Sequence, residues 1–255
     1  MTRRRLAGAL AALACAGVVA GVLLATAGDD APPRPRAAAP PAPPREARRA
    51  APTPQLGLGR AVGAQLHRRT QLRARPGGPV VRTLGTRTGF GSERVMAVVA
   101  RRGRWLGVLS HHMPNSRAGW IPADSATLLW EPYTLHVDLS ERRLVVRRDG
   151  RVVRRVTVAI GRPGSPTPTG RFAVTDLLRI SGGRSPYGCC ALALSGRQPN
   201  VPQGWGGGDR LAIHGTPDDS TLGTAASSGC LRAGDRDMRW LLAHIPLGAP
   251  VRIRA

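Results

Sequence analysis

The chain has 255 residues and a formal net charge of +23, and all 38 of its Lys or Arg positions are arginine. The absence of lysine excludes a Schiff-base lysine, a P-loop phosphate lysine and a Ser-x-x-Lys acyl-transfer pair. Residues 1–55 hold eight Arg against three acidic residues, residues 56–130 twelve against two, and residues 131–255 eighteen against ten. Because this surplus is spread along the chain and no nucleic-acid-binding motif occurs, we expect a cationic surface suited to an anionic environment and no nucleic-acid partner.

The first 27 residues have the pattern of an export signal. Three arginines at 3–5 precede an apolar run over 6–27, which ends in the small-x-small sequence Ala-Thr-Ala. A run of about 22 residues is also long enough to span a bilayer. We therefore predict that residues 1–27 are a cleaved signal peptide or an N-terminal membrane anchor. Either one places the remainder outside the cytoplasm, so we expect an exported protein of the cell envelope that meets a membrane only through this segment.

Residues 28–55 form a segment rich in Pro, Ala and Arg, with paired prolines at 32–33, 40–41 and 43–44. A sequence of this composition cannot bury a hydrophobic core and stays extended. We therefore predict a linker here.

Residues 56–130 are predicted to form a small β domain. Short strand patterns occur at 71–74, 80–83, 95–101, 105–109 and 119–122, separated by glycine-containing turns. The stretches LRARP (72–76), RWLGV (104–108) and AGWI (118–121) resemble a bacterial SH3-like domain, which implies a small β-barrel. Such domains often bind cell-wall glycopeptides, but the simpler interpretation is a spacer with Trp105 and Trp120 packed in its core.

Residues 131–255 predict a second, mainly β domain with one short covering helix. Strand patterns occupy 143–148 and 151–159 on either side of Asp149-Gly150, a strong hairpin signal. A helix is predicted at 235–244, where acidic residues occupy the first turn and apolar residues recur at helical spacing. The remaining strands make a mostly antiparallel sheet; they are predicted at 133–138, 171–177, 190–194, 210–214 and 250–254.

Cys230 and His214 are the candidate catalytic pair. Cys230 lies in SSGCLR (227–232), where the backbone amides of Gly229 and Cys230 could donate to a bound carbonyl oxygen as an oxyanion hole. Arg232 would favour the thiolate and could hold a substrate carboxylate. His214 ends a predicted strand just before Gly215, where a side chain can leave the sheet and act as the base for a thiol.

Residues 131–255 resemble the catalytic domain of YkuD-type L,D-transpeptidases. The matching stretches, in chain order, are TPTGRF (167–172), SPYG (185–188), IHGT (213–216) and SSGCLR (227–232). The resemblance implies that Cys230 is the nucleophile and His214 the general base and acid. It also implies that the Gly215 backbone carbonyl orients His214 and that the Gly229 amide serves the oxyanion hole. It further assigns four residues to substrate binding: Arg232, Tyr187, Thr216 and Ser227.

Two positions depart from the family pattern. Many members have His directly before the Gly-Cys pair, where this chain has Ser228, so we expect Ser228 to line the site without a second histidine. Cys189 and Cys190 also replace residues that are more usually apolar or aromatic. We interpret them as one strand-end thiol and one buried thiol, with a vicinal disulfide as the alternative. No His spacing predicts a metal site, and no cofactor is expected.

The function implied by the resemblance is acyl transfer on peptidoglycan stem peptides. Cys230 would form a thioacyl enzyme that an amine on a second stem resolves, giving a 3→3 cross-link by a protein expected to be monomeric. Water as the acceptor would make an L,D-carboxypeptidase, and a catalytically inactive wall-binding protein is a further alternative. NlpC/P60 peptidases also accompany SH3-like domains, but they place Cys before His, which is the reverse of the order here.

Overall fold

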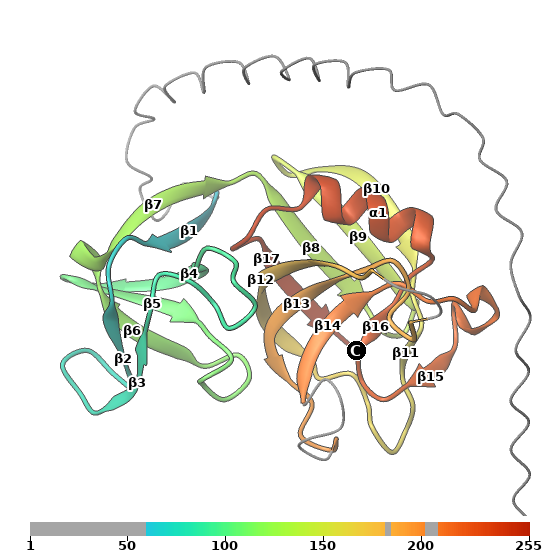
Figure 1. Ribbon diagram of the computed structural model, residues 1–255, viewed down its shortest axis with the longest axis horizontal. Coiled ribbons are helices and arrows are strands. Elements are labelled where there is room, and N and C mark those ends of the chain that lie inside the picture. Colours follow the sequence, from blue (N-terminus) through green and yellow to red (C-terminus); the bar gives the residue numbers. More distant parts are fainter. Residues whose placement is uncertain (1–59, 182–184, 202–208) are drawn as a thin grey trace, which may run out of the picture. The chain divides into compact units, whose positions relative to one another are not determined.

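The structure is a computed structural model that describes residues 60–181, 185–201 and 209–255. The predictions for the signal or anchor at 1–27 and for the linker at 28–55 lie outside these residues. All the described residues belong to one compact unit, and two β-sheets make up most of it (Figure 1). Within that part of the chain, no helix is both long and apolar enough to cross a membrane.

The first sheet is fully antiparallel, and its seven strands follow the order β3-β2-β6-β5-β4-β1-β7. A short 3-10 turn, η1 (Ala123–Ser125), leads from β6 into β7. The strands are β1 (Ala61–Leu66), β2 (Thr70–Arg73), β3 (Val80–Leu84), β4 (Val95–Arg102), β5 (Trp105–Leu109), β6 (Ala118–Pro122) and β7 (Ala126–Glu131).

The first sheet closes over a core of its own. Leu72, Leu106 and Ile121 are fully buried there, and alternation along β2, β5 and β6 directs them to one side. Trp120 is buried as expected, whereas Trp105 is only half-buried, so the packing prediction for that residue is wrong. The likeness of this sheet to an SH3-like domain remains a prediction.

The second sheet has eight strands in the order β10-β9-β8-β17-β12-β13-β14-β16. It is mostly antiparallel, as predicted, although β8 and β17 run parallel and so do β14 and β16. A separate parallel pair joins β11 (Ile160–Gly161) to β15 (Ala225–Ser227). The strands of the large sheet are β8 (Tyr133–Asp138), β9 (Arg143–Arg148), β10 (Arg151–Thr157), β12 (Gly170–Arg179), β13 (Cys190–Arg197), β14 (Arg210–His214), β16 (Leu231–Arg232) and β17 (Pro250–Arg254).

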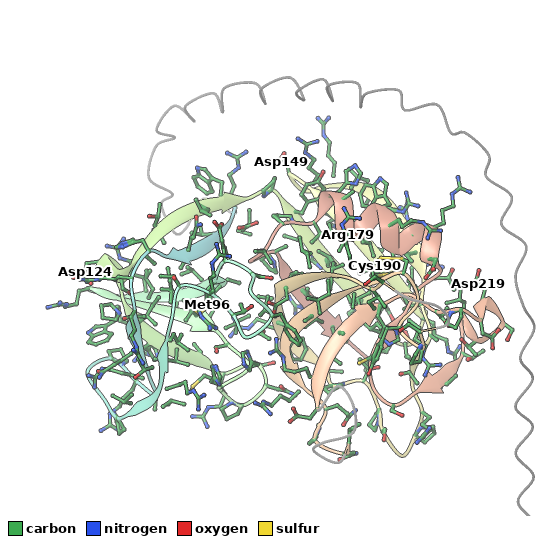
Figure 2. The ribbon with its side chains drawn as sticks, viewed as in Figure 1. Met96, Asp124, Asp149, Arg179, Cys190 and Asp219 are labelled. Carbon is green, nitrogen blue, oxygen red and sulfur yellow. A yellow bond between two sulfur atoms is a disulfide. The ribbon has the colours of Figure 1, made fainter. Side chains whose placement is uncertain are left out.

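One α-helix, α1 (Asp235–His244), covers the core side of the second sheet, and it lies near β9 and β10 in Figure 1. Met238 and Leu241 on its apolar side are fully buried in the same core as the strands. On its polar side, Asp237 pairs with Arg154 of β10. The β9–β10 hairpin turns at Asp149 and Gly150, both with positive φ, as a type I′ turn requires (Figure 2).

Polar side chains join the two sheets. Asn115, after β5, donates from Nδ2 to the Arg197 carbonyl over 2.7 Å, and its Oδ1 accepts from the Arg197 amide over 2.9 Å. Thr88, between β3 and β4, donates its hydroxyl proton to the buried Asp176 of β12. Asp176 also lies 3.8 Å from the Arg210 guanidinium at the start of β14. The first sheet therefore contacts β12 and β13, and Asp176 links that contact to the strand that ends in His214.

Candidate active site

The parallel strands β14 and β16 bring the candidate catalytic residues together. In their register His214 is opposite Arg232, and Ile213 is opposite Leu231. Ile213 and Leu231 are fully buried in the core. Because side chains alternate along a strand, His214, Arg232 and Cys230 share the other face of this strand pair. Cys230 comes directly before β16, so it lies one step along the same row from Arg232.

His214 is held as a neutral base. Its Nδ1 lies 2.7 Å from the Gly215 carbonyl, which can only accept, so Nδ1 carries the proton and Nε2 keeps a lone pair. This is the contact expected of Gly215. Burial lowers the pKa of His214 to about 4, the charge of Arg232 acts in the same direction, and the bond to Gly215 opposes them. At neutral pH the imidazole is therefore uncharged and able to take a proton.

Cys230 is the free cysteine of the described residues and is partly buried. Its Sγ lies 3.8 Å from the Arg210 carbonyl, to which a thiol proton can be donated. Burial raises the pKa of Cys230, while a backbone hydrogen bond with Ala212 and the charge of Arg232 lower it. The pKa shifts therefore favour a protonated thiol at Cys230 and a neutral imidazole at His214.

Hydrogen bonds of the Ser227 side chain stabilise the turn before Cys230. The Ser227 hydroxyl donates to the Cys230 carbonyl over 2.6 Å and accepts from the Gly229 amide over 3.0 Å. Ser227 is 1% exposed, so this side chain supports the turn, and its role in substrate binding stays a prediction. The Gly229 amide donates to Ser227 in this structure, and its role in an oxyanion hole stays a prediction. Ser228, half-buried between them, remains the residue of this turn that is open to solvent.

Tyr187 and Thr216 take different places around His214. The Tyr187 side chain is 38% exposed, and its ring meets the His214 ring edge-on with centroids 5.0 Å apart. Thr216 is buried, and its hydroxyl donates to the Asp218 carbonyl and accepts from the Asp218 amide. Tyr187 can therefore contact a bound molecule, whereas the Thr216 hydroxyl bonds within the loop after His214, and its role in substrate binding stays a prediction.

Arg232 has the features of an anion ligand. Its Nε is buried and has no hydrogen-bond partner in the described part of the chain. No carboxylate among the described residues forms an ion pair with it either, although its charge acts on both His214 and Cys230. A half-buried arginine beside the candidate thiol, with a buried Nε that has no partner, favours a substrate that brings its own carboxylate.

Two supporting residues were not predicted. Gln198, which is 2% exposed, packs its side chain against Gly229 and donates from Nε2 to the Pro166 carbonyl. Asp235, at the start of α1, accepts from the Cys189 amide over 3.0 Å. Asp235 carried only a helix-start signal in the sequence. Gln198 carried none, because its role depends on two loops that meet only in the folded chain.

Cys189 and Cys190 are joined as a vicinal disulfide, so the interpretation as two thiols is not what the structure shows. Cys190 lies in the core beneath α1, and its carbonyl accepts from the Gly215 amide over 3.0 Å (Figure 2). The pair therefore lies directly behind the strand end that carries His214. Within the described residues, no group of three or more His, Cys, Asp or Glu side chains could hold a metal ion.

Comparisons with known proteins match this part of the chain. A solved structure of L,D-transpeptidase 3 from Mycobacterium tuberculosis with a faropenem-derived adduct is 17% identical, with a TM-score of 0.42, over 54% of this chain and 73% of that one. YkuD of Bacillus licheniformis is 34% identical over 122 residues, which are 48% of this chain and 66% of that protein.

A family model also matches, and a second relative shows the family. The YkuD model, described as the L,D-transpeptidase catalytic domain, matches residues 132–253. YkuD of Bacillus subtilis (strain 168), an L,D-transpeptidase by name, is 32% identical over 146 residues, which are 55% of this chain and 80% of that protein. On these two matches, the chain belongs to the family of YkuD-type L,D-transpeptidases.

Proposed function

We propose that this protein is an exported L,D-transpeptidase that forms 3→3 cross-links between peptidoglycan stem peptides. The observation that carries the proposal is the neutral His214, whose Nε2 lone pair lies on the same face as the Cys230 thiol and the unpaired Arg232. A neutral base, a thiol and a carboxylate ligand are the parts that acyl transfer between charged peptides requires.

In the acylation step, Nε2 of His214 takes the Cys230 proton and Sγ attacks the carbonyl carbon of the third stem residue. The backbone amide of Cys230 stabilises the negative charge on the carbonyl oxygen. The Gly229 amide, the other predicted donor, is bonded to Ser227 in the resting structure. The bond to the terminal D-Ala then breaks, and the imidazolium returns its proton to the leaving amine. The product is a thioester on Cys230.

In the second step an amine of another stem attacks the thioester. His214 takes the proton from the amine as the carbon–nitrogen bond forms, and Cys230 leaves as a thiolate that regains the proton. Water in place of the amine would release a tripeptide, which is the carboxypeptidase alternative. Arg232 holds a carboxylate of the stem peptide in both steps.

The segments before residue 131 are proposed to export the catalytic domain and to hold it at the wall. We infer that residues 1–27 are a signal peptide or anchor, that 28–55 are a linker, and that 56–130 are an SH3-like domain ahead of the catalytic domain at 131–255. The protein acts as a monomer at the wall. The first sheet acts as a spacer or binds wall glycopeptides.

Incubation of the full chain with a disaccharide tetrapeptide tests the reaction. We expect cross-linked dimers and released D-Ala, with His214→Gln forming neither and Cys189→Ser, at a disulfide-bonded cysteine, forming both. Tripeptide without dimer would replace the proposal with the carboxypeptidase. No product of either kind, with binding to intact peptidoglycan retained, would establish the inactive wall-binding protein.

A further inference from the structure

The second sheet has a solvent-facing side that carries an unusual number of arginines. Along β8, β9, β17 and the start of β12, alternate residues such as Leu135, Val146 and Val251 are buried in the core. The residues between them point the other way. We call the arginines on this outer side the arginine face: Arg143, Arg147, Arg155, Arg171, Arg252 and Arg254.

The strand registers place part of the arginine face in one continuous row. Residues that pair across neighbouring strands share a face of the sheet. Five strands are about 19 Å wide, at about 4.8 Å for each step. The row runs Arg155–Val145–His136–Arg252–Arg171, and each neighbouring pair in it is a register pair.

Acidic residues offset only part of this charge. Asp138 pairs with Arg254 over 2.7 Å, and Glu141 pairs with Arg143 over 3.0 Å. The other four members of the arginine face have no carboxylate partner among the described residues. His136, in the middle of the row, has its pKa lowered first by burial and then by the charges of Arg147, Arg252 and Arg254, so the local potential is positive.

We propose that the arginine face binds a linear polyanion with repeating phosphate groups, laid across the strands along this row. Guanidinium groups match phosphate oxygens in a two-pronged geometry, and every cation here is arginine. Neighbouring strands rotate by about 20–25°, so five strands cannot lie flat on a bilayer, whereas a flexible chain can follow their twist.

Binding at this surface would leave the active site open. The row ends at β12, whereas His214 ends β14 and Cys230 directly precedes β16, and both strands lie beyond β13 in the sheet. A phosphate polymer on the row would therefore hold the enzyme beside its substrate without competing with it. The location of the enzyme beside such a polymer in the cell envelope rests on the proposed function. The existence of the arginine face does not depend on that function.

The test compares two triple variants of the full chain in detergent micelles, with inorganic polyphosphate as the probe. Arg155→Gln, Arg171→Gln and Arg252→Gln together remove the charges of the row. Because each lost phosphate contact lowers the salt slope by about 0.7, we expect the slope of log K against log salt to fall by about 2 and the affinity by about ten-fold or more.

The matched control removes three exposed arginines of the first sheet and its turns: Arg69→Gln, Arg75→Gln and Arg104→Gln. It has the same net charge as the first variant and should keep most of the affinity. An equal loss in the control would overturn the proposal, because net charge alone would then explain binding. Equal affinity for poly-L-glutamate would overturn it as well, since phosphate would not be recognised.

A vesicle measurement separates the membrane from the polymer. If the row variant loses more affinity for phosphatidylglycerol vesicles than for polyphosphate, the occupant is a lipid surface and the proposal is wrong. Acylation by a carbapenem should be unchanged in the row variant, because none of its three positions touches the active site. Loss of polyphosphate binding with intact acylation is therefore the expected result, and it is independent of whether the enzyme cross-links.

Discussion

The Nε2 lone pair of His214 is the residue-scale feature on which the chemistry depends. It exists because the Gly215 carbonyl fixes the proton on Nδ1 and because burial and Arg232 keep the ring uncharged. His214 and Cys230 were predicted from their local sequence context, and Arg232 from its charge. The bonds that Ser227 and Thr216 make within their own loops were not predicted, because a hydroxyl group in a motif does not reveal whether it bonds to its own loop.

The pH dependence of acylation should report the pKa of His214. Its pKa is lowered from 6.5 to about 4, so the base stays deprotonated until the pH falls toward 4. We expect the rate of acylation by a saturating carbapenem to lose half its value near pH 4. Arg232→Gln removes a positive charge that lowers this pKa, so the acid limb should move to higher pH.

Arg236→Gln is the matched control for that shift, since Arg236 is an exposed arginine of α1 and loses the same charge. In this variant the fall in acylation rate at low pH should occur at the same pH as in the unmodified chain. A limb near pH 6.5 in the unmodified chain would contradict a buried, neutral His214.

Gly229 tests the turn that presents the nucleophile. Its φ is +117°, and a Cβ there would collide with the Gln198 side chain. Gly229→Ala should therefore cost about 1–3 kcal/mol of stability and slow carbapenem acylation by at least about ten-fold, a factor worth about 1.4 kcal/mol.

Gly164→Ala is the control, because Gly164 has no positive φ and no atom within 4 Å of an added Cβ. Thermal unfolding and acylation rates should be close to those of the unmodified chain. Equal behaviour of the two variants would show that the turn tolerates a side chain and that Gln198 does not hold it.

At the scale of elements, local patterns predicted most strands that pair through hairpins. The strands at 105–109 and 143–148 and the helix at 235–244 have the bounds that were predicted. β1 was missed because its small residues Gly63 and Ala64 interrupt any clear alternation. β16 is only two residues long, and its parallel pairing with β14 is fixed by contacts distant in sequence. That pairing builds the active site, so its geometry was beyond local reasoning.

Asp235 links the start of α1 to the turn that carries Tyr187. Its Oδ1 accepts from the Cys189 amide, and a Cβ on either Gly188 or Gly215 would collide with the same oxygen. Asp235→Leu should misplace the turn that carries Tyr187 and lower kcat/KM for the tetrapeptide by about ten-fold or more.

Asp235→Asn keeps an oxygen acceptor at that position and should restore most of the activity. Measuring kcat and KM separately for the two variants distinguishes positioning from loss of fold. Loss of the same size in Asn and Leu variants would mean that the negative charge matters more than the hydrogen bond.

At the scale of the whole molecule, two sheets with separate cores are joined by a small apolar cluster of Ala97, Leu109 and Ala173 and by polar contacts. Asn115 exchanges two hydrogen bonds with Arg197, and Thr88 bonds to Asp176. The composition predicted two β modules, but no residue pattern indicated these contacts. Each of these hydrogen bonds joins residues more than 80 positions apart, which local sequence patterns do not report.

Asn115→Ala should weaken this junction. It removes both bonds to the Arg197 backbone and leaves that part-buried amide and carbonyl unpaired, at a cost of about 1–3 kcal/mol. Urea unfolding should show the loss. Asn200→Ala is the control, because Asn200 is exposed and its side chain makes only a 3.4 Å contact. Unchanged stability in Asn115→Ala would mean that the sheets are held by other contacts.

The central claim is that Cys230 attacks an acyl group with His214 as its base. Intact-protein mass spectrometry of the full chain after exposure to a carbapenem tests this most directly. We predict one added drug mass, located by fragmentation on the peptide that contains Cys230, and no adduct in Cys230→Ala. An adduct that persists in Cys230→Ala, or one located on Cys189 or Cys190, would contradict the claim.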